Sequence, residues 1–203
     1  MLIFTGVLIL ALMLAFNLPV MYAGARLSAE QSCADTQGYP VAARTRPLLA
    51  ALLLCGGVLP AWIITGSPLF AIFVLLLASA AYIDCLTQWV PDVLIFALSW
   101  VALWAQLTGN PDPVIPLSGA VVMLAPALIL NVITWLRRQP SAIASGDLYV
   151  LPAVGVWLPP EWSGICLLLS LGLTALAGRY VEDVPFITVL YPVFMGVSLC
   201  GAW

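Results

Sequence analysis

The sequence contains no lysine and no histidine, and charged residues make up only 7% of its 203 residues. A soluble globular domain carries about 25% charged residues and about 45–50% apolar ones, whereas 64% of this chain is hydrophobic. Because so little polar surface is available to face water, we predict an all-α polytopic membrane helix bundle. We expect it to form a single integral-membrane domain over residues 1–203.

The missing histidines remove the commonest general base and the commonest metal ligand. The five cysteines form no CxxC pair, so the closely spaced ligands of a structural zinc site are absent. We therefore predict neither a metal nor a cofactor, and acid–base chemistry has to use carboxylates, thiols or tyrosines. The six arginines form no basic stripe along the chain, which argues against a nucleic-acid partner.

Apolar segments predict about eight transmembrane crossings. Seven are long enough to span, while residues 148–158 are apolar but fall short of the roughly 20 residues that a plain span needs. That short segment carries Pro152 and Gly155, and it either crosses as a short helix or re-enters. The seven longer segments are 1–23, 47–65, 68–84, 92–107, 114–136, 162–178 and 184–203.

The first apolar segment has two possible interpretations. Ala23-Gly24-Ala25 resembles a signal-peptide cleavage site, but no cation precedes the apolar run and Arg26 follows it. This order favours a retained span with its N-terminus outside. Alternating from there, all six arginines fall on one face, which is therefore predicted to be cytoplasmic. The polar stretch 27–46 becomes a cytoplasmic loop.

Two aspartates, Asp84 and Asp147, fall at the same depth near the cytoplasmic boundary on different segments. A lone aspartate there is commonly a helix cap, but an intramembrane carboxylate also marks a functional site by default. Two carboxylates held close cannot both ionise, so the pair would share a proton. One could then activate water while the other protonates a carbonyl. Asp92, directly after Pro91, is better explained as a first-turn carboxylate.

The residues around this pair resemble a known family. Residues 82–92 (YIDCLTQWVPD) resemble the D-x6-P-D segment of the type IV prepilin peptidases, which are GxGD intramembrane aspartyl proteases. Ala144-Ser145-Gly146-Asp147 resembles the GxGD motif itself. Residues 155–158 (GVWL) are similar to the G-x-W-[LI] that follows it, and residues 184–186 (VPF) to the I-P-F before the last helix. The resemblance covers a peptidase core over residues 71–203.

This resemblance implies an endopeptidase of the bacterial inner membrane that removes the leader peptide from prepilin-like proteins at the cytoplasmic face. Such substrates carry a basic leader followed by an apolar helix. The expected partners are therefore a prepilin-like substrate protein and the lipid bilayer. The implied catalytic residues are Asp84 and Asp147. The supporting motif residues are Ala144, Gly146, Pro91 and Asp92.

The sequence departs from the family at three places. Ala144 replaces the first glycine of GxGD, and Tyr149 replaces a lysine. Alanine is small enough for close approach and would be strained only if the position required a positive φ. The loop 27–46 contains only Cys33 instead of two CxxC pairs, which marks a short form. We therefore predict peptidase activity without N-methyltransferase activity.

Two other classes of function use the same residues. A transporter or channel subunit could employ Asp84 and Asp147 as a proton or cation site, although the spans show no evident inverted repeat. A non-catalytic subunit of a pilus or secretion apparatus is the third possibility.

Overall fold

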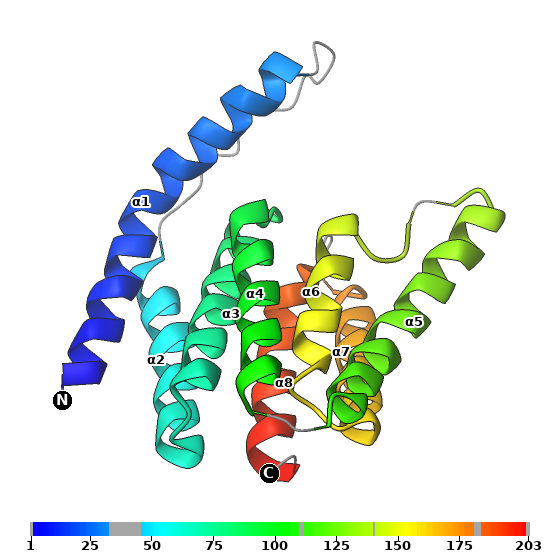
Figure 1. Cartoon of the computed structure of the whole chain (residues 1–203). Coiled ribbons are helices and arrows are strands. Elements are labelled where there is room, and N and C mark those ends of the chain that lie inside the picture. Colours follow the sequence, from blue (N-terminus) through cyan, green and yellow to red (C-terminus); the bar gives the residue numbers. More distant parts are fainter. Residues whose placement is uncertain (1, 33–45, 110–111, 140, 181–183, 202–203) are drawn as a thin grey trace.

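The computed structural model describes residues 2–32, 46–109, 112–139, 141–180 and 184–201. Within these ranges the chain forms eight helices and no strands, and Figure 1 shows them side by side in one bundle. The C-terminal ends of α1 and α5 extend away from the bundle (Figure 1). The helices are α1 Leu2–Ser32, α2 Pro47–Thr65, α3 Pro68–Thr87, α4 Asp92–Gly109, α5 Val114–Leu136, α6 Ser145–Gly155, α7 Pro160–Ala177 and α8 Phe186–Gly201.

Helix α3 is the centre of one half of the bundle, where it contacts α1, α2, α4 and α8. Every residue from Leu77 to Asp84 is buried. This run includes Ala78, Ser79, Ala80 and Ala81, whose small side chains allow neighbouring helices to approach closely, as is usual inside membrane bundles. Helices α5, α6 and α7 form the other half, and α8 joins the halves through contacts with α3 and α7.

The outer surface of the bundle is apolar. Four helices, α2, α3, α5 and α7, are long and apolar enough to cross a membrane, and shorter apolar stretches lie within α1, α4 and α8. Large apolar side chains point outward, among them Leu52, Trp104 and Leu168. A soluble protein rarely exposes so continuous an apolar surface. The prediction of an all-helical polytopic membrane bundle is therefore confirmed.

The short segment 148–158, for which two courses were open, crosses the bundle. Helix α6 begins beside the start of α4, where Asp147 and Asp92 line the same cavity. Near the other end of α4, Gln106 donates a hydrogen bond from Nε2 to the Val156 carbonyl over 3.3 Å. Because α6 accompanies α4 from one end towards the other, the structure favours the crossing course for this segment.

Several predicted boundaries shift. The loop expected over residues 27–46 is wrong at its start, because α1 continues to Ser32 through residues that include the good helix formers Leu27, Ala29 and Glu30. Residues 33–45 of that loop lie outside the described part of the chain. Helix α3 also continues past Asp84 to Thr87, so this aspartate stands within the helix rather than at its end.

Helices α5 and α6 touch through two glycines. A Cβ added to Gly155 would lie 2.6 Å from the Gly119 carbonyl oxygen and 2.8 Å from the Ala120 Cα, and one added to Gly119 would clash with the carbonyls of Gly155 and Leu158. The buried Ser163 hydroxyl reaches those same two carbonyls, at 3.4 and 3.3 Å. Such backbone-to-backbone contact leaves no space for a side chain, so this crossing fixes where α6 lies.

We expect Gly155→Ala to destabilise the bundle by about 1–3 kcal/mol, because the added methyl group must push α5 and α6 apart. Thermal unfolding in detergent, followed by tryptophan fluorescence, measures the change. Gly172→Ala on α7 is the matched control, since a Cβ added to Gly172 would meet no other atom within 4 Å. Equal melting temperatures for the two variants would show that the crossing is not tight.

Candidate active site

Three segments that are distant in the sequence meet around a cavity of 440 Å³ at one end of the bundle. They are the end of α3 with the turn that leads to the first residue of α4, the start of α6, and the start of α8 with the two residues before it. We name this space the aspartate cavity, because Asp84 and Asp147 both line it. Its lining is Asp84, Gln88, Trp89, Val90, Asp92, Ala144, Ser145, Gly146, Asp147, Val184, Pro185 and Phe186.

Asp84 is held rigidly in the last turns of α3. Its side chain is only 5% exposed, and its Oδ2 accepts a hydrogen bond from the Thr188 backbone N–H over 3.2 Å. The Thr188 hydroxyl also lies 3.4 Å from this oxygen and 2.9 Å from the Ala81 carbonyl. Just beyond, Gln88 ends the helix at φ 53° while its N–H bonds the Asp84 carbonyl. Thr188 of α8 thus fixes one carboxylate oxygen.

Asp147 lies in the first turn of α6. A carboxylate there is favoured by the partial positive charge of the helix N-terminus. Ala144 precedes this helix at φ −61° and ψ 149°, which is ordinary extended backbone. The alanine that replaces the expected glycine is therefore not strained, and the departure from the GxGD motif leaves the local geometry intact.

The loop before α6 is held by Asn131, which lies on α5. Its side-chain amide donates to the Ile143 carbonyl over 2.8 Å, and its carbonyl oxygen accepts from the Ile143 N–H over 2.9 Å. Ile143 immediately precedes Ala144, so this pair of hydrogen bonds fixes the approach to Asp147. Neither Asn131 nor Thr188 was singled out from the sequence, although a polar side chain within an apolar span is a signal that could have found both.

The remaining predicted residues divide into two groups. Gly146 lines the aspartate cavity, as does Asp92, which opens α4. The Pro91 carbonyl accepts the first hydrogen bond of that helix, from Leu94 over 2.9 Å. The residues of the GVWL motif are not part of the cavity. They lie at the far end of α6, where the Trp157 ring packs 5.1 Å from Phe70 and 5.2 Å from Phe73.

Asp84 and Asp147 line the same cavity, and two negative charges that share a cavity repel each other. This repulsion disfavours a doubly charged pair, so the pair is suited to hold one proton between them. Such a pair can both accept and donate a proton, which is the chemistry of acid–base hydrolysis. Within the described residues, no three His, Cys, Asp or Glu side chains gather as metal ligands.

Comparison with known proteins gives the same family. The type IV leader peptidase family model matches residues 71–200, which is more than half of the chain. The chain belongs to the type IV leader peptidase family. Over 93 residues it is 41% identical to the prepilin leader peptidase/N-methyltransferase of Dickeya chrysanthemi, a match that covers 44% of this chain and 30% of that protein. No solved structure matches the chain.

In this leader peptidase family member, Thr188 gives a test of how Asp84 is held. Thr188→Val keeps the side-chain shape and the backbone N–H but removes the hydroxyl, whereas Thr188→Ser keeps the hydroxyl. One hydrogen bond of this kind is worth about 0.5–1.5 kcal/mol. We therefore expect Thr188→Val to lower the free energy of unfolding by about 0.5–1.5 kcal/mol, measured by thermal unfolding in detergent. Thr188→Ser should stay near wild type, and equal losses in the two variants would contradict the assignment.

Proposed function

We propose that this protein is an aspartic endopeptidase that removes the leader peptide from prepilin-like substrates. The observation that carries the proposal is that Asp84 of α3 and Asp147 of α6 line one cavity. Membership of the leader peptidase family supports a peptidase, and the two carboxylates supply its chemistry without any other group.

In the proposed reaction, a water molecule lies between the two aspartates. One carboxylate takes a proton from the water as its oxygen attacks the carbonyl carbon of the scissile peptide bond. The other, protonated carboxyl gives its proton to the carbonyl oxygen. When the resulting tetrahedral adduct collapses, the carbon–nitrogen bond breaks, the first carboxyl returns its proton to the leaving nitrogen, and the second carboxylate takes a proton from a hydroxyl of the adduct. The products are a leader with a new carboxylate and a mature chain with a new amine.

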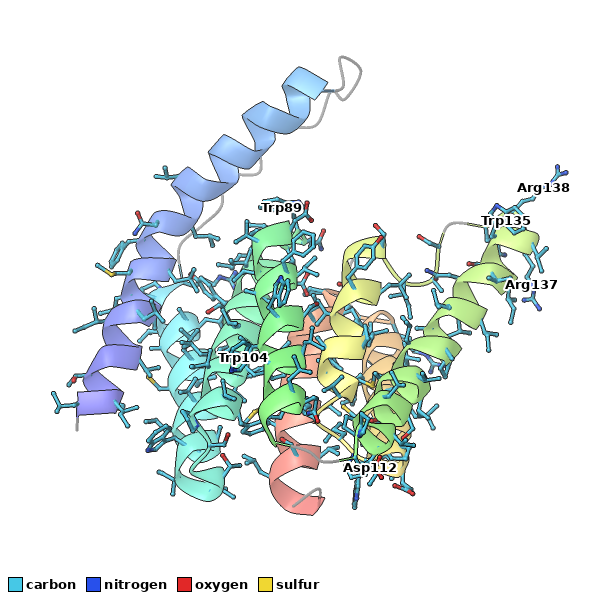
Figure 2. All side chains as sticks on the ribbon, viewed as in Figure 1. Trp89, Trp104, Asp112, Trp135, Arg137 and Arg138 are labelled. Carbon is cyan, nitrogen blue, oxygen red and sulfur yellow. The ribbon has the colours of Figure 1, made fainter. Side chains whose placement is uncertain are left out.

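We further propose that the aspartate cavity faces the cytoplasm. Figure 2 shows Arg137 and Arg138 at the same end of the bundle as Trp89, which lines this cavity, with Asp112 at the opposite end. Arg46 also lies at the end that holds the aspartate cavity, where its backbone N–H donates a hydrogen bond to the Tyr82 hydroxyl over 3.3 Å. Arginines gather on the cytoplasmic side of membrane proteins. A basic leader would then meet the cavity from the cytoplasm, while the apolar helix of the substrate stays in lipid.

The proposal is limited to the peptidase reaction. The relative from Dickeya chrysanthemi is also named as an N-methyltransferase, but the match covers only 30% of its length. The absence of methylation was predicted from the loop 27–46, whose one cysteine is Cys33. Residues 33–45 of this loop lie outside the described part of the chain. Peptidase activity alone therefore stays our prediction.

Replacement of either aspartate tests the proposal. We expect Asp84→Asn and Asp147→Asn each to reduce leader removal by about 10²- to 10⁴-fold, because an amide can neither take the proton from water nor return it. The measurement is co-expression with a candidate prepilin, with the leader loss followed by gel shift and the rates compared in purified membranes.

Asp112→Asn is the control, since Asp112 lies at the opposite end of the bundle, where its Oδ1 accepts a hydrogen bond from the Val114 N–H at the start of α5. This variant should process substrate at the wild-type rate. If Asp84→Asn or Asp147→Asn removed the leader at the wild-type rate, the assignment of these two residues as the catalytic pair would be overturned. A wild-type enzyme that cleaves no prepilin would favour a transport or assembly role.

A further inference from the structure

A groove on the side of the bundle lies over α6, between α4 and α5. It has a volume of 350 Å³, and its walls include Ser99 and Leu103 of α4, Leu117 of α5, and Ala153 and Val156 of α6. Helix α6 packs against both neighbours and lies between them in Figure 1, so it forms the floor. We name this space the α6 groove. Among the described residues it shares no wall with the aspartate cavity.

One face of α4 connects the two spaces. Asp92 lines the aspartate cavity, and Ser99, Leu103 and Gln106 line the α6 groove. Phe96, which lies between them in the sequence, is exposed. These positions follow one another at steps of three and four residues, so they share one face of the helix. At a rise of about 1.5 Å per residue, this face extends over about 21 Å.

Helix α6 repeats the pattern. Gly146 lines the aspartate cavity, Tyr149 is exposed, and Ala153 and Val156 line the α6 groove. These residues are again three or four positions apart, so they also lie on one face. Helices α4 and α6 therefore present neighbouring faces that lead from Asp147 at one end of the bundle to the groove near the other end.

The lining of the groove suits a helix better than a lipid chain. It contains the small side chains of Ser99, Ala102 and Ala153, whereas the outward surface of α7 presents large ones such as Leu168 and Leu173. Small residues allow two membrane helices to approach closely enough for their backbones to pack. A helix gains such contacts along its whole length, so the α6 groove favours a helix as its occupant.

The polar side chains of the groove already have partners. The Ser99 hydroxyl donates a hydrogen bond to the Ile95 carbonyl over 3.0 Å, and the Gln106 amide donates one to the Val156 carbonyl over 3.3 Å. An apolar occupant therefore leaves neither group unsatisfied.

We propose that the α6 groove holds an apolar helix of the substrate, which runs from the scissile bond at the aspartate cavity along the neighbouring faces of α4 and α6. The inference rests on the proposed peptidase function, because that function places the scissile bond at Asp84 and Asp147. It adds the place of the rest of the substrate and defines the substrate class. That class is a protein cut beside a membrane helix of at least about 14 residues, the length that matches this face.

Photocrosslinking tests the groove in the otherwise unchanged full chain. A benzoylphenylalanine residue replaces Leu103 or Leu117 in the groove, with Leu52 of α2 and Leu168 of α7 as matched controls, since all four leucines are exposed. Membranes that contain the protein and a full-length prepilin are then irradiated. We expect crosslinks to prepilin from Leu103 and Leu117 and none above background from the two controls. Crosslinks from the groove to lipid alone, or to a second copy of this chain, would overturn the proposal.

Narrowing of the groove gives a kinetic test. Ser99→Trp places a large ring in the groove at an exposed position, whereas Gly172→Trp places the same ring on the exposed surface of α7, where an added Cβ meets no atom within 4 Å. A group that no longer fits an apolar site costs about tenfold or more. Ser99→Trp should therefore raise KM for prepilin by about tenfold and keep kcat within about twofold of the wild type. Gly172→Trp should match the wild type in both constants.

The outcomes separate this inference from the function on which it rests. An unchanged KM in Ser99→Trp, or an equal rise in both tryptophan variants, would overturn the groove while continued cleavage upheld the peptidase. A wild-type protein that crosslinks prepilin from Leu103 and Leu117 without removing its leader would overturn the peptidase and keep the groove as a binding surface.

Discussion

The whole arrangement depends on keeping two carboxylates within an otherwise apolar bundle. An ionised carboxylate that is buried away from water costs free energy unless it is paired or hydrogen-bonded, so each aspartate needs local compensation. Asp84 obtains it from the Thr188 backbone N–H, and Asp147 from its place in the first turn of α6. These two solutions require that α3, α6 and α8 meet at one point. The contacts between the helices of the bundle bring α3, α6 and α8 together at the aspartate cavity.

Both ends of α6 are fixed by contacts with α5. At the far end, Gly119 and Gly155 let the two backbones touch. At the near end, Asn131 holds Ile143 by two hydrogen bonds. A helix of 11 residues is too short to be stable by its own propensity, so it depends on these fixed ends. This gives a physical role to the GVWL motif, which lies far from the carboxylates and yet determines where the helix that carries Asp147 can lie.

Much of the fold follows from the sequence because hydrophobic length is a strong signal in a membrane protein. The spans predicted at 47–65 and 114–136 coincide with α2 and α5. The pairing of Asp84 with Asp147 in one cavity was also predictable, since so few other charges fall at that depth. The crossing by 148–158 was not, because length alone allows two courses. The end of α1 was missed because polar residues near Glu30 are compatible with either helix or loop.

The partners of the carboxylates could not be derived from the sequence either. Thr188 and Asn131 act over long sequence separations, and nothing in their local sequence shows which backbone group each will meet. Ala144 is the opposite case: its departure from glycine was visible at once, and only the observed φ of −61° shows that it is harmless.

The central claim, that Asp84 and Asp147 act as one pair on the substrate, is tested most directly with a prepilin peptide whose scissile bond is replaced by a hydroxyl-bearing isostere. The hydroxyl occupies the place of the attacking water, so the peptide resembles the tetrahedral adduct. Its affinity for the wild-type protein in detergent should exceed that of a matched reduced-amide peptide by at least about 10²-fold, and Asn at either position should remove that advantage. Equal affinity for the two peptides, or an advantage that survives both substitutions, would contradict the account.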